Sequence, residues 1–114
     1  MRGRGKYGST AVVWNGERFH SKKELARWQE LLSMERQGFI AGLLRQVPYV
    51  LIPKTPIGSA VKYVADFVYL KDGKRVVEDA KAFDKASGKF LSTPDFKIKW
   101  KLMFHVHGIT VVLV

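Results

Sequence analysis

Cysteine is absent from this sequence of 114 residues, so the fold contains no disulfide and no thiolate zinc site. No apolar run is long enough to cross a membrane, and no secretory signal pattern is present. Acidic residues are few, because 10 Asp and Glu stand against 20 Lys and Arg, and the net charge is +10. We therefore expect a cytoplasmic protein (in the host cell, if a phage encodes it) that contacts no membrane and binds a polyanion such as DNA.

The composition is sufficient for one domain with a hydrophobic core. Hydrophobic residues make up 46% of the chain, and this length is close to the commonest domain size. Residues 1–9 differ from the rest, because they are rich in glycine and carry Arg2, Arg4 and Lys6. We expect a flexible basic arm that either contacts DNA phosphates or has no role, followed by a single domain over residues 10–114.

Two dipeptides predict tight hairpins, because both central residues of a type I′ turn need positive φ. Asn15-Gly16 predicts a short hairpin near the N-terminus, and Asp72-Gly73 predicts a longer one between residues 61–70 and 75–81. Helix signals lie on either side of these turns. Ser21 is a good N-cap for a first helix, and Thr93 followed by proline opens a second one. The positions expected to face the core in the second helix are Ile98, Leu102 and Val106.

Further strands are predicted over residues 43–52 and 109–114, the latter buried on both faces because it is almost wholly apolar. Residues 82–93 are expected to form a flexible loop. The resulting order is a short hairpin, a helix, three strands, a helix and a last strand. We therefore expect an α/β fold in which helices cover a mixed central sheet.

The longer hairpin brings two acidic residues together. Counting outwards from its turn places Asp66 directly opposite Asp79, and directly opposed side chains on one face lie about 4.5–5.5 Å apart. Lys81 shares this face, whereas Glu78 points to the other. Two adjacent carboxylates require a bound cation, a shared proton or a close basic group. Oxygen ligands of this kind suit a hard cation such as Mg²⁺.

Two other polar residues are candidates for the same site, and each has a second interpretation. Glu24 follows Ser21 at the spacing of a capping box, in which it would only cap the helix. It also lies at the edge of the buried helix face, where it could reach a metal. Gln46 interrupts an apolar run, so it is either a surface residue or a polar group directed at the site.

A basic row follows one face of the second helix. Lys97, Lys101 and His105 recur every four residues, which places them on one side of the helix. Such a row can bind phosphates, and it is also typical of a face in contact with water.

Together these residues resemble the PD-(D/E)XK nuclease superfamily, and within it a phage-type group similar to Holliday-junction-resolvase-like endonucleases. The resemblance covers nearly the whole chain. The segments that carry it are Lys6-Tyr7, Phe19-x-Ser21-Lys22-Lys23-Glu24, Gln46-Val47-Pro48-Tyr49-x-Leu51-Ile52-Pro53, Val61-Lys62-Tyr63-x-Ala65-Asp66-Phe67 and Val77-Glu78-Asp79-x-Lys81. One departure is Ala65, which stands in place of the proline that names the superfamily.

The resemblance implies a restriction-endonuclease-like αβββαβ core and metal-dependent cleavage of DNA. Asp66, Asp79 and Glu24 would bind Mg²⁺, for which Mn²⁺ can substitute. Lys81 would orient or activate the attacking water, and Gln46 would be an accessory residue. Arg2, Arg4, Lys6, Lys97 and Lys101 are the candidate DNA contacts.

The leading functional hypothesis is a structure-selective endonuclease that acts on a Holliday junction or other branched DNA. The chain has no evident module for reading bases, and cutting a junction symmetrically would require a homodimer. The alternatives are a restriction-like, flap or single-strand nuclease with the same site, and a DNA-binding protein on this fold that does not catalyse a reaction.

Overall fold

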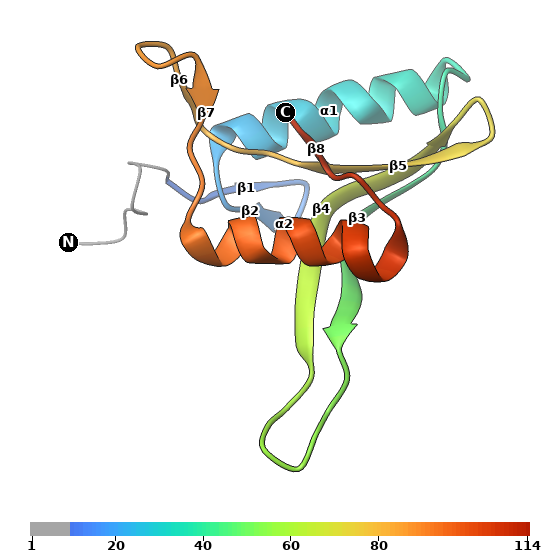
Figure 1. Ribbon diagram of the computed structural model, residues 1–114. Helices are drawn as coiled ribbons and strands as arrows, with labels where there is room; N and C mark the ends of the chain where they lie inside the picture. Colours follow the sequence, from blue (N-terminus) through green and yellow to red (C-terminus); the bar gives the residue numbers. More distant parts are fainter. Residues whose placement is uncertain (1–9) are drawn as a thin grey trace.

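Figure 1 shows a computed structural model of the protein, which describes residues 10–114. The elements in chain order are β1 (Val12–Trp14), β2 (Glu17–Phe19), α1 (Lys22–Arg36), β3 (Ala41–Ile52), β4 (Val61–Lys71), β5 (Lys74–Asp79), β6 (Phe83–Asp84), β7 (Lys89–Phe90), α2 (Pro94–His107) and β8 (Val112–Leu113). The main sheet has the order β3-β4-β5-β8, antiparallel except for the parallel pair β5–β8. The predicted α/β mixed-sheet fold is confirmed. The N-terminal arm with Arg2, Arg4 and Lys6 lies outside the described residues.

Both predicted hairpin turns form where the Asx-Gly pairs stand. Asn15 and Asp72 each have a φ of 52°, and the glycine after each is also left-handed. The register of the second hairpin runs from Lys71 opposite Lys74 to Phe67 opposite Glu78, as predicted from its turn. The paired ladder ends there, one position before Asp66 and Asp79.

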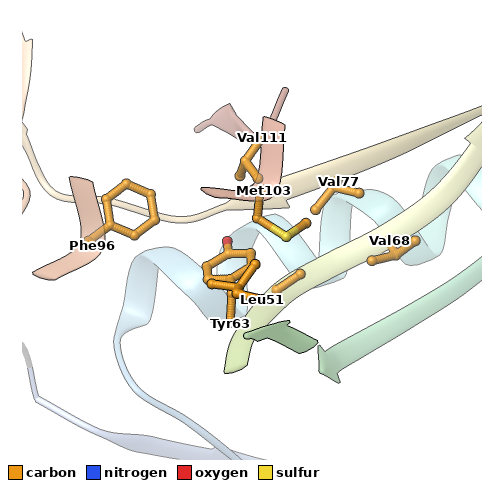
Figure 2. Packing of buried hydrophobic residues seen from close by; sticks show 8 residues of the cluster. Leu51, Tyr63, Val68, Val77, Phe96, Met103 and Val111 are labelled. Atoms are coloured by element: carbon orange, nitrogen blue, oxygen red, sulfur yellow. The ribbon is translucent and has the colours of Figure 1, made fainter. Parts of the chain in front are cut away.

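The two helices cover opposite faces of the sheet. Phe67 and Tyr69 of β4 belong to a buried cluster with Leu31 of α1. Val68, between them, belongs to the cluster with Met103 of α2, as alternation along a strand requires. Figure 2 shows this second cluster, and Figure 1 shows the sheet between the helices. Within residues 10–114, neither helix is long and apolar enough to cross a membrane.

The prediction for the core face of α2 was wrong at two of its three positions. Ile98 and Val106 are exposed, whereas Leu102 is partly buried against the core. Phe96 and Met103 are the buried residues of this helix. Phe96 and Trp100 also stack on each other and pack on the sheet side. Both sets recur at helical spacing, and the aromatic set buries more apolar area, so the helix turns that face inward.

Two further segments differ from expectation. Residues 82–93 contain the short β6–β7 hairpin, in which Phe83 pairs with Phe90. The C-terminal run is not buried on both faces, because β8 is an edge strand and the side chain of Val112 is half-exposed. Val111 just before it is fully buried.

Candidate active site

A pocket of about 430 Å³ lies where the N-termini of both helices approach the sheet. Ser21 and Thr93 are the N-caps of α1 and α2, and each accepts a hydrogen bond from the backbone N–H three residues later. The predicted site residues that line this pocket are Glu24, Gln46, Asp66, Asp79 and Lys81. Five residues from four parts of the chain therefore line one pocket, as the sequence predicted.

Asp79, at the end of β5, accepts contacts from two groups. Its Oδ1 lies 3.1 Å from Lys81 Nζ, and its Oδ2 accepts a hydrogen bond from the Tyr63 hydroxyl. Lys81 Nζ also lies 3.9 Å from the ring centroid of Phe96, which holds the amine over the pocket by a cation–π contact. Asp79 and Lys81 lie on the same side of one extended segment because they are two residues apart, and Phe96 of α2 holds the lysine amine.

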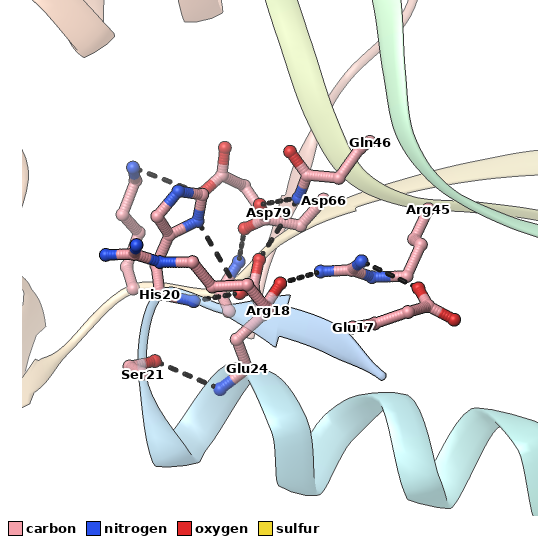
Figure 3. Close-up of polar contacts among 11 residues, drawn as sticks. Glu17, Arg18, His20, Ser21, Glu24, Arg45, Gln46, Asp66 and Asp79 are labelled. Carbon is pink, nitrogen blue, oxygen red and sulfur yellow. Dashed lines mark hydrogen bonds and ion pairs between the residues drawn. The ribbon is translucent and has the colours of Figure 1, made fainter. Parts of the chain in front are cut away.

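The Asp66 side chain also contacts the end of β5, where it binds a backbone N–H. Its Oδ2 accepts the Ala80 N–H at 2.8 Å, and its Oδ1 lies 3.3 Å from Gln46 Nε2. The same Gln46 nitrogen lies 3.3 Å from Glu24 Oε2, so one amide stands between two carboxylates (Figure 3). The amide supplies hydrogen-bond donors at a place where two negative charges meet.

Glu24 caps the start of the first helix and also faces the pocket. The residue is 2% exposed. One oxygen accepts the His20 N–H at 2.7 Å, which caps the chain just before α1, and the other oxygen faces Gln46. The capping contact falls on His20, one residue before the position that a standard capping box uses.

Gln46 has an unusual backbone. Its φ is 56°, a left-handed conformation that is uncommon outside glycine. Its neighbours Arg45 and Val47 pair normally with Phe67 and Ala65, so the distortion is confined to the position beside Asp66. Strained residues of this kind concentrate at functional sites, and here the strain accompanies a side chain directed into the pocket.

The pKa values of Asp66 and Asp79 are raised mainly because both carboxyls are buried. Burial, followed by the contacts with Glu24, raises the pKa of the Asp66 carboxyl to about 6. Burial and the nearby Asp66 raise the pKa of Asp79. Burial and the Asp79 carboxylate also raise the pKa of Tyr63, so this hydroxyl stays protonated and donates. Lys81 and the Ala80 N–H only partly oppose the rise at Asp66.

Glu78 lies on the other face of the sheet, as predicted. Arg27 of α1 donates to both of its oxygens, at 2.9 and 2.7 Å, and the Tyr69 hydroxyl donates a third bond. This buried acid is fully paired and takes no part in the pocket.

Besides Lys81, the lysines that line the pocket differ from the candidate DNA contacts on α2. Lys97 and Lys101 lie on the exposed face of α2 and do not line the pocket. Lys62 and Lys99 line it instead. Alternation along β4 from Asp66 back to position 62 could have identified Lys62.

The structure also tests whether the acids already form a metal centre. Among residues 10–114, no group of three or more His, Cys, Asp or Glu side chains is arranged to hold a metal ion. In this arrangement the carboxylate oxygens face the amide of Gln46, the amine of Lys81 and the hydroxyl of Tyr63. The donor chemistry nevertheless fits Mg²⁺, because three carboxylates meet at one pocket and two of them have raised pKa values.

Comparison with known proteins gives one match. A family model described as "Protein of unknown function (DUF1064)" matches residues 4–111, nearly the whole chain. No curated protein and no solved structure matches the chain.

Proposed function

We propose that this chain, which belongs to the DUF1064 family of unknown function, is a metal-dependent DNA endonuclease of the PD-(D/E)XK type. The observation that carries the proposal is the convergence of Asp66, Asp79 and Lys81 on one pocket. In that pocket the lysine amine lies 3.1 Å from Asp79. A structural role alone does not explain two buried acids that share so little compensating charge.

Asp66 and Asp79, with Glu24, are the residues that would hold Mg²⁺ or Mn²⁺. A divalent cation bound there would lower the pKa of a coordinated water and neutralise charge on the attacked phosphodiester. The raised pKa values of Asp66 and Asp79 support this assignment, because an added positive charge favours both ionised forms. Gln46 would have an accessory role, since its amide already contacts two of the three carboxylates.

Lys81 would orient the attacking water or stabilise charge that develops on the phosphate. Its amine is fixed by Asp79 and by the ring of Phe96 at the wall of the pocket. A fixed cation next to the reacting phosphate costs no reorganisation as charge develops, which is the usual origin of electrostatic catalysis.

DNA is the substrate that the charge favours. The net charge of +10 supplies affinity for the phosphate backbone that does not depend on sequence. Lys62 and Lys99 add positive charge at the pocket, and the N-termini of α1 and α2 both open towards it. We further propose that the enzyme acts in the cytoplasm on branched DNA such as a Holliday junction, as a homodimer.

A cleavage panel tests this proposal. The substrates are a four-way junction, a flap, a single strand and a linear duplex, each with Mg²⁺ or with EDTA. Cleavage of branched DNA is expected only with the metal. Asp79→Asn should abolish cleavage and retain DNA binding, whereas Asp72→Asn, the same change at an exposed turn, should leave both cleavage and DNA binding unchanged. A chain that binds these DNAs and cuts none of them with Mg²⁺ or Mn²⁺ would instead be a non-catalytic DNA-binding protein.

A further inference from the structure

The outer half of the β3–β4 hairpin extends well beyond both helices (Figure 1). One of its faces is used by the fold, because Tyr49, Leu51 and Tyr63 pack with the α2 cluster. The alternate positions point away from this cluster, where no helix covers them at this distance from α1 (Figure 1). Ala65 and Val68 both belong to the cluster, so β4 changes the side that it turns to α2 between them, and Lys62 and Val64 do not share the face of Val68.

The uncovered face is apolar. Val50 and Ile52 are each 44% exposed, and Val64 is 46% exposed. Val50 lies opposite Lys62, and Pro48 lies opposite Val64 in the antiparallel register. We call this surface the hairpin strip, and its residues are Pro48, Val50, Ile52, Lys62 and Val64.

The hairpin strip is continuous with the pocket. Lys62 and Val64 line the pocket together with Asp66, two residues further along the same strand. Any extended molecule that reaches Asp66 and leaves along β4 therefore passes over the strip.

The tip of the hairpin is closed by two backbone hydrogen bonds and carries an exposed isoleucine. Thr55 and Gly58 exchange these bonds, of 3.0 and 3.2 Å, around Pro56 and Ile57. Ile57 is 98% exposed, so it adds nothing to the core. It extends the exposed apolar surface of the hairpin to its tip and is accessible to a ligand there.

The charge of this surface is of one sign. Residues 48–65 contain Lys54 and Lys62 and no acidic residue. A surface that combines lysines with exposed aliphatic side chains matches a ligand with anionic groups and apolar faces side by side. Paired DNA presents phosphates outside and keeps its base faces stacked, whereas an unpaired strand exposes both.

We propose that the hairpin strip and Ile57 bind unpaired bases of the DNA strand that enters the pocket, and so select forked or branched DNA over perfect duplex. This inference rests on the proposed function and deepens it, because it assigns the structure preference to a defined surface. Apolar side chains that contact or separate bases are a recurring means of recognising distorted DNA.

The test measures binding without cleavage. The probes are a forked duplex with two unpaired arms and a fully paired duplex of the same length, in EDTA, followed by fluorescence anisotropy. Ile57→Ser and Val50→Thr should each weaken binding of the fork about threefold to tenfold and change duplex binding less than about twofold. Ile98→Ser, the same change as Ile57→Ser at an exposed position of α2 outside the pocket, should leave both affinities unchanged.

The outcomes separate this inference from the proposed function. If no DNA is cut with Mg²⁺ but fork binding still depends on Ile57, the strip binds unpaired bases and the nuclease proposal fails. If forks are cut and Ile57→Ser changes neither affinity, or changes both equally, the inference is overturned. If Ile57→Ser or Val50→Thr changes the sedimentation of the protein without DNA and leaves fork binding unchanged, the strip is an interface between two copies. That result would also overturn the inference.

Discussion

Asp66→Asn should stabilise the protein at neutral pH while it abolishes cleavage. The carboxyl of Asp66 has a pKa of about 6, above its ordinary value of 3.8. A native-state pKa raised by this amount corresponds to about 3 kcal/mol of lost stability at pH 7. Asparagine keeps an oxygen for the Ala80 N–H, but its NH2 group then faces the Gln46 nitrogen from which Asp66 Oδ1 accepts a hydrogen bond, which offsets part of the gain. The expected gain is therefore about 1–2 kcal/mol, or roughly 5–10 °C in Tm for a domain of this size.

The sign of the pH dependence follows from linkage. Because the folded protein binds this proton more tightly than the unfolded chain does, wild-type stability falls as the pH rises from about 4 to about 6. The penalty is fully present at pH 7 and absent at low pH. The advantage of Asp66→Asn should therefore be large at pH 7 and small at pH 4.5, as measured by urea unfolding followed by circular dichroism.

Metal binding provides a second measurement on the same pair of proteins. If Asp66 binds Mg²⁺, the ion stabilises the wild-type protein by about 2.7 kcal/mol at one hundred times its Kd, and stabilises the variant much less. Asp72→Asn is the control for both experiments, because it makes the same substitution at an exposed turn where asparagine is equally suited to positive φ. A variant no more stable than wild type at pH 7, or a gain independent of pH, would refute the charge argument for this site.

Three further predictions concern neighbouring residues. Lys81→Ala should lower the turnover of DNA about a hundredfold or more and change its Kd less than about threefold, and the opposite pattern in single-turnover and binding assays would make the lysine a phosphate contact. Tyr63→Phe removes a donor that lowers the pKa of Asp79, so the rising limb of the pH–rate profile should move to higher pH; a limb that does not move would show that ionisation of Asp79 does not limit the rate. Arg27→Met leaves its buried carboxylate partner on β5 unpaired and should cost about 3 kcal/mol in urea unfolding. Glu30→Ala, which removes only the exposed ion pair of the same arginine, should cost less than about 0.5 kcal/mol.

The parts of the structure that local chemistry determines could be predicted from the sequence. Asp72-Gly73 sets the register of the central hairpin, and with it the approach of Asp66 to Asp79. Ser21 sets the start of α1, which places Glu24 at the pocket. Both the hairpin turn and the start of the helix are determined by residues at or next to them in the sequence. Predicting them therefore requires no knowledge of tertiary contacts.

The parts that depend on competition between similar surfaces could not be predicted. The second helix offers two apolar stripes at the same spacing, and the sheet accepts the one with Phe96 and Met103. Nothing near Gln46 in the sequence signals its positive φ, because the strain arises from the position that the strand takes beside Asp66. Tyr63 lies an odd number of positions from Asp66, so strand alternation directed attention away from its contact with Asp79.

The consecutive residues Glu78 and Asp79 allow a comparison of two buried acids within one strand. Both are acids on β5, and both are almost fully buried. Glu78 receives a two-pronged arginine and a hydroxyl, the pairing expected when a buried charge serves the fold. Asp79 shares its pocket with a second raised-pKa acid, and only one amine in contact with it opposes the two. The fold therefore neutralises Glu78 with its own side chains, whereas the pocket of Asp79 gathers several carboxylates beside Lys81, which fits the proposal that a cation from outside binds there.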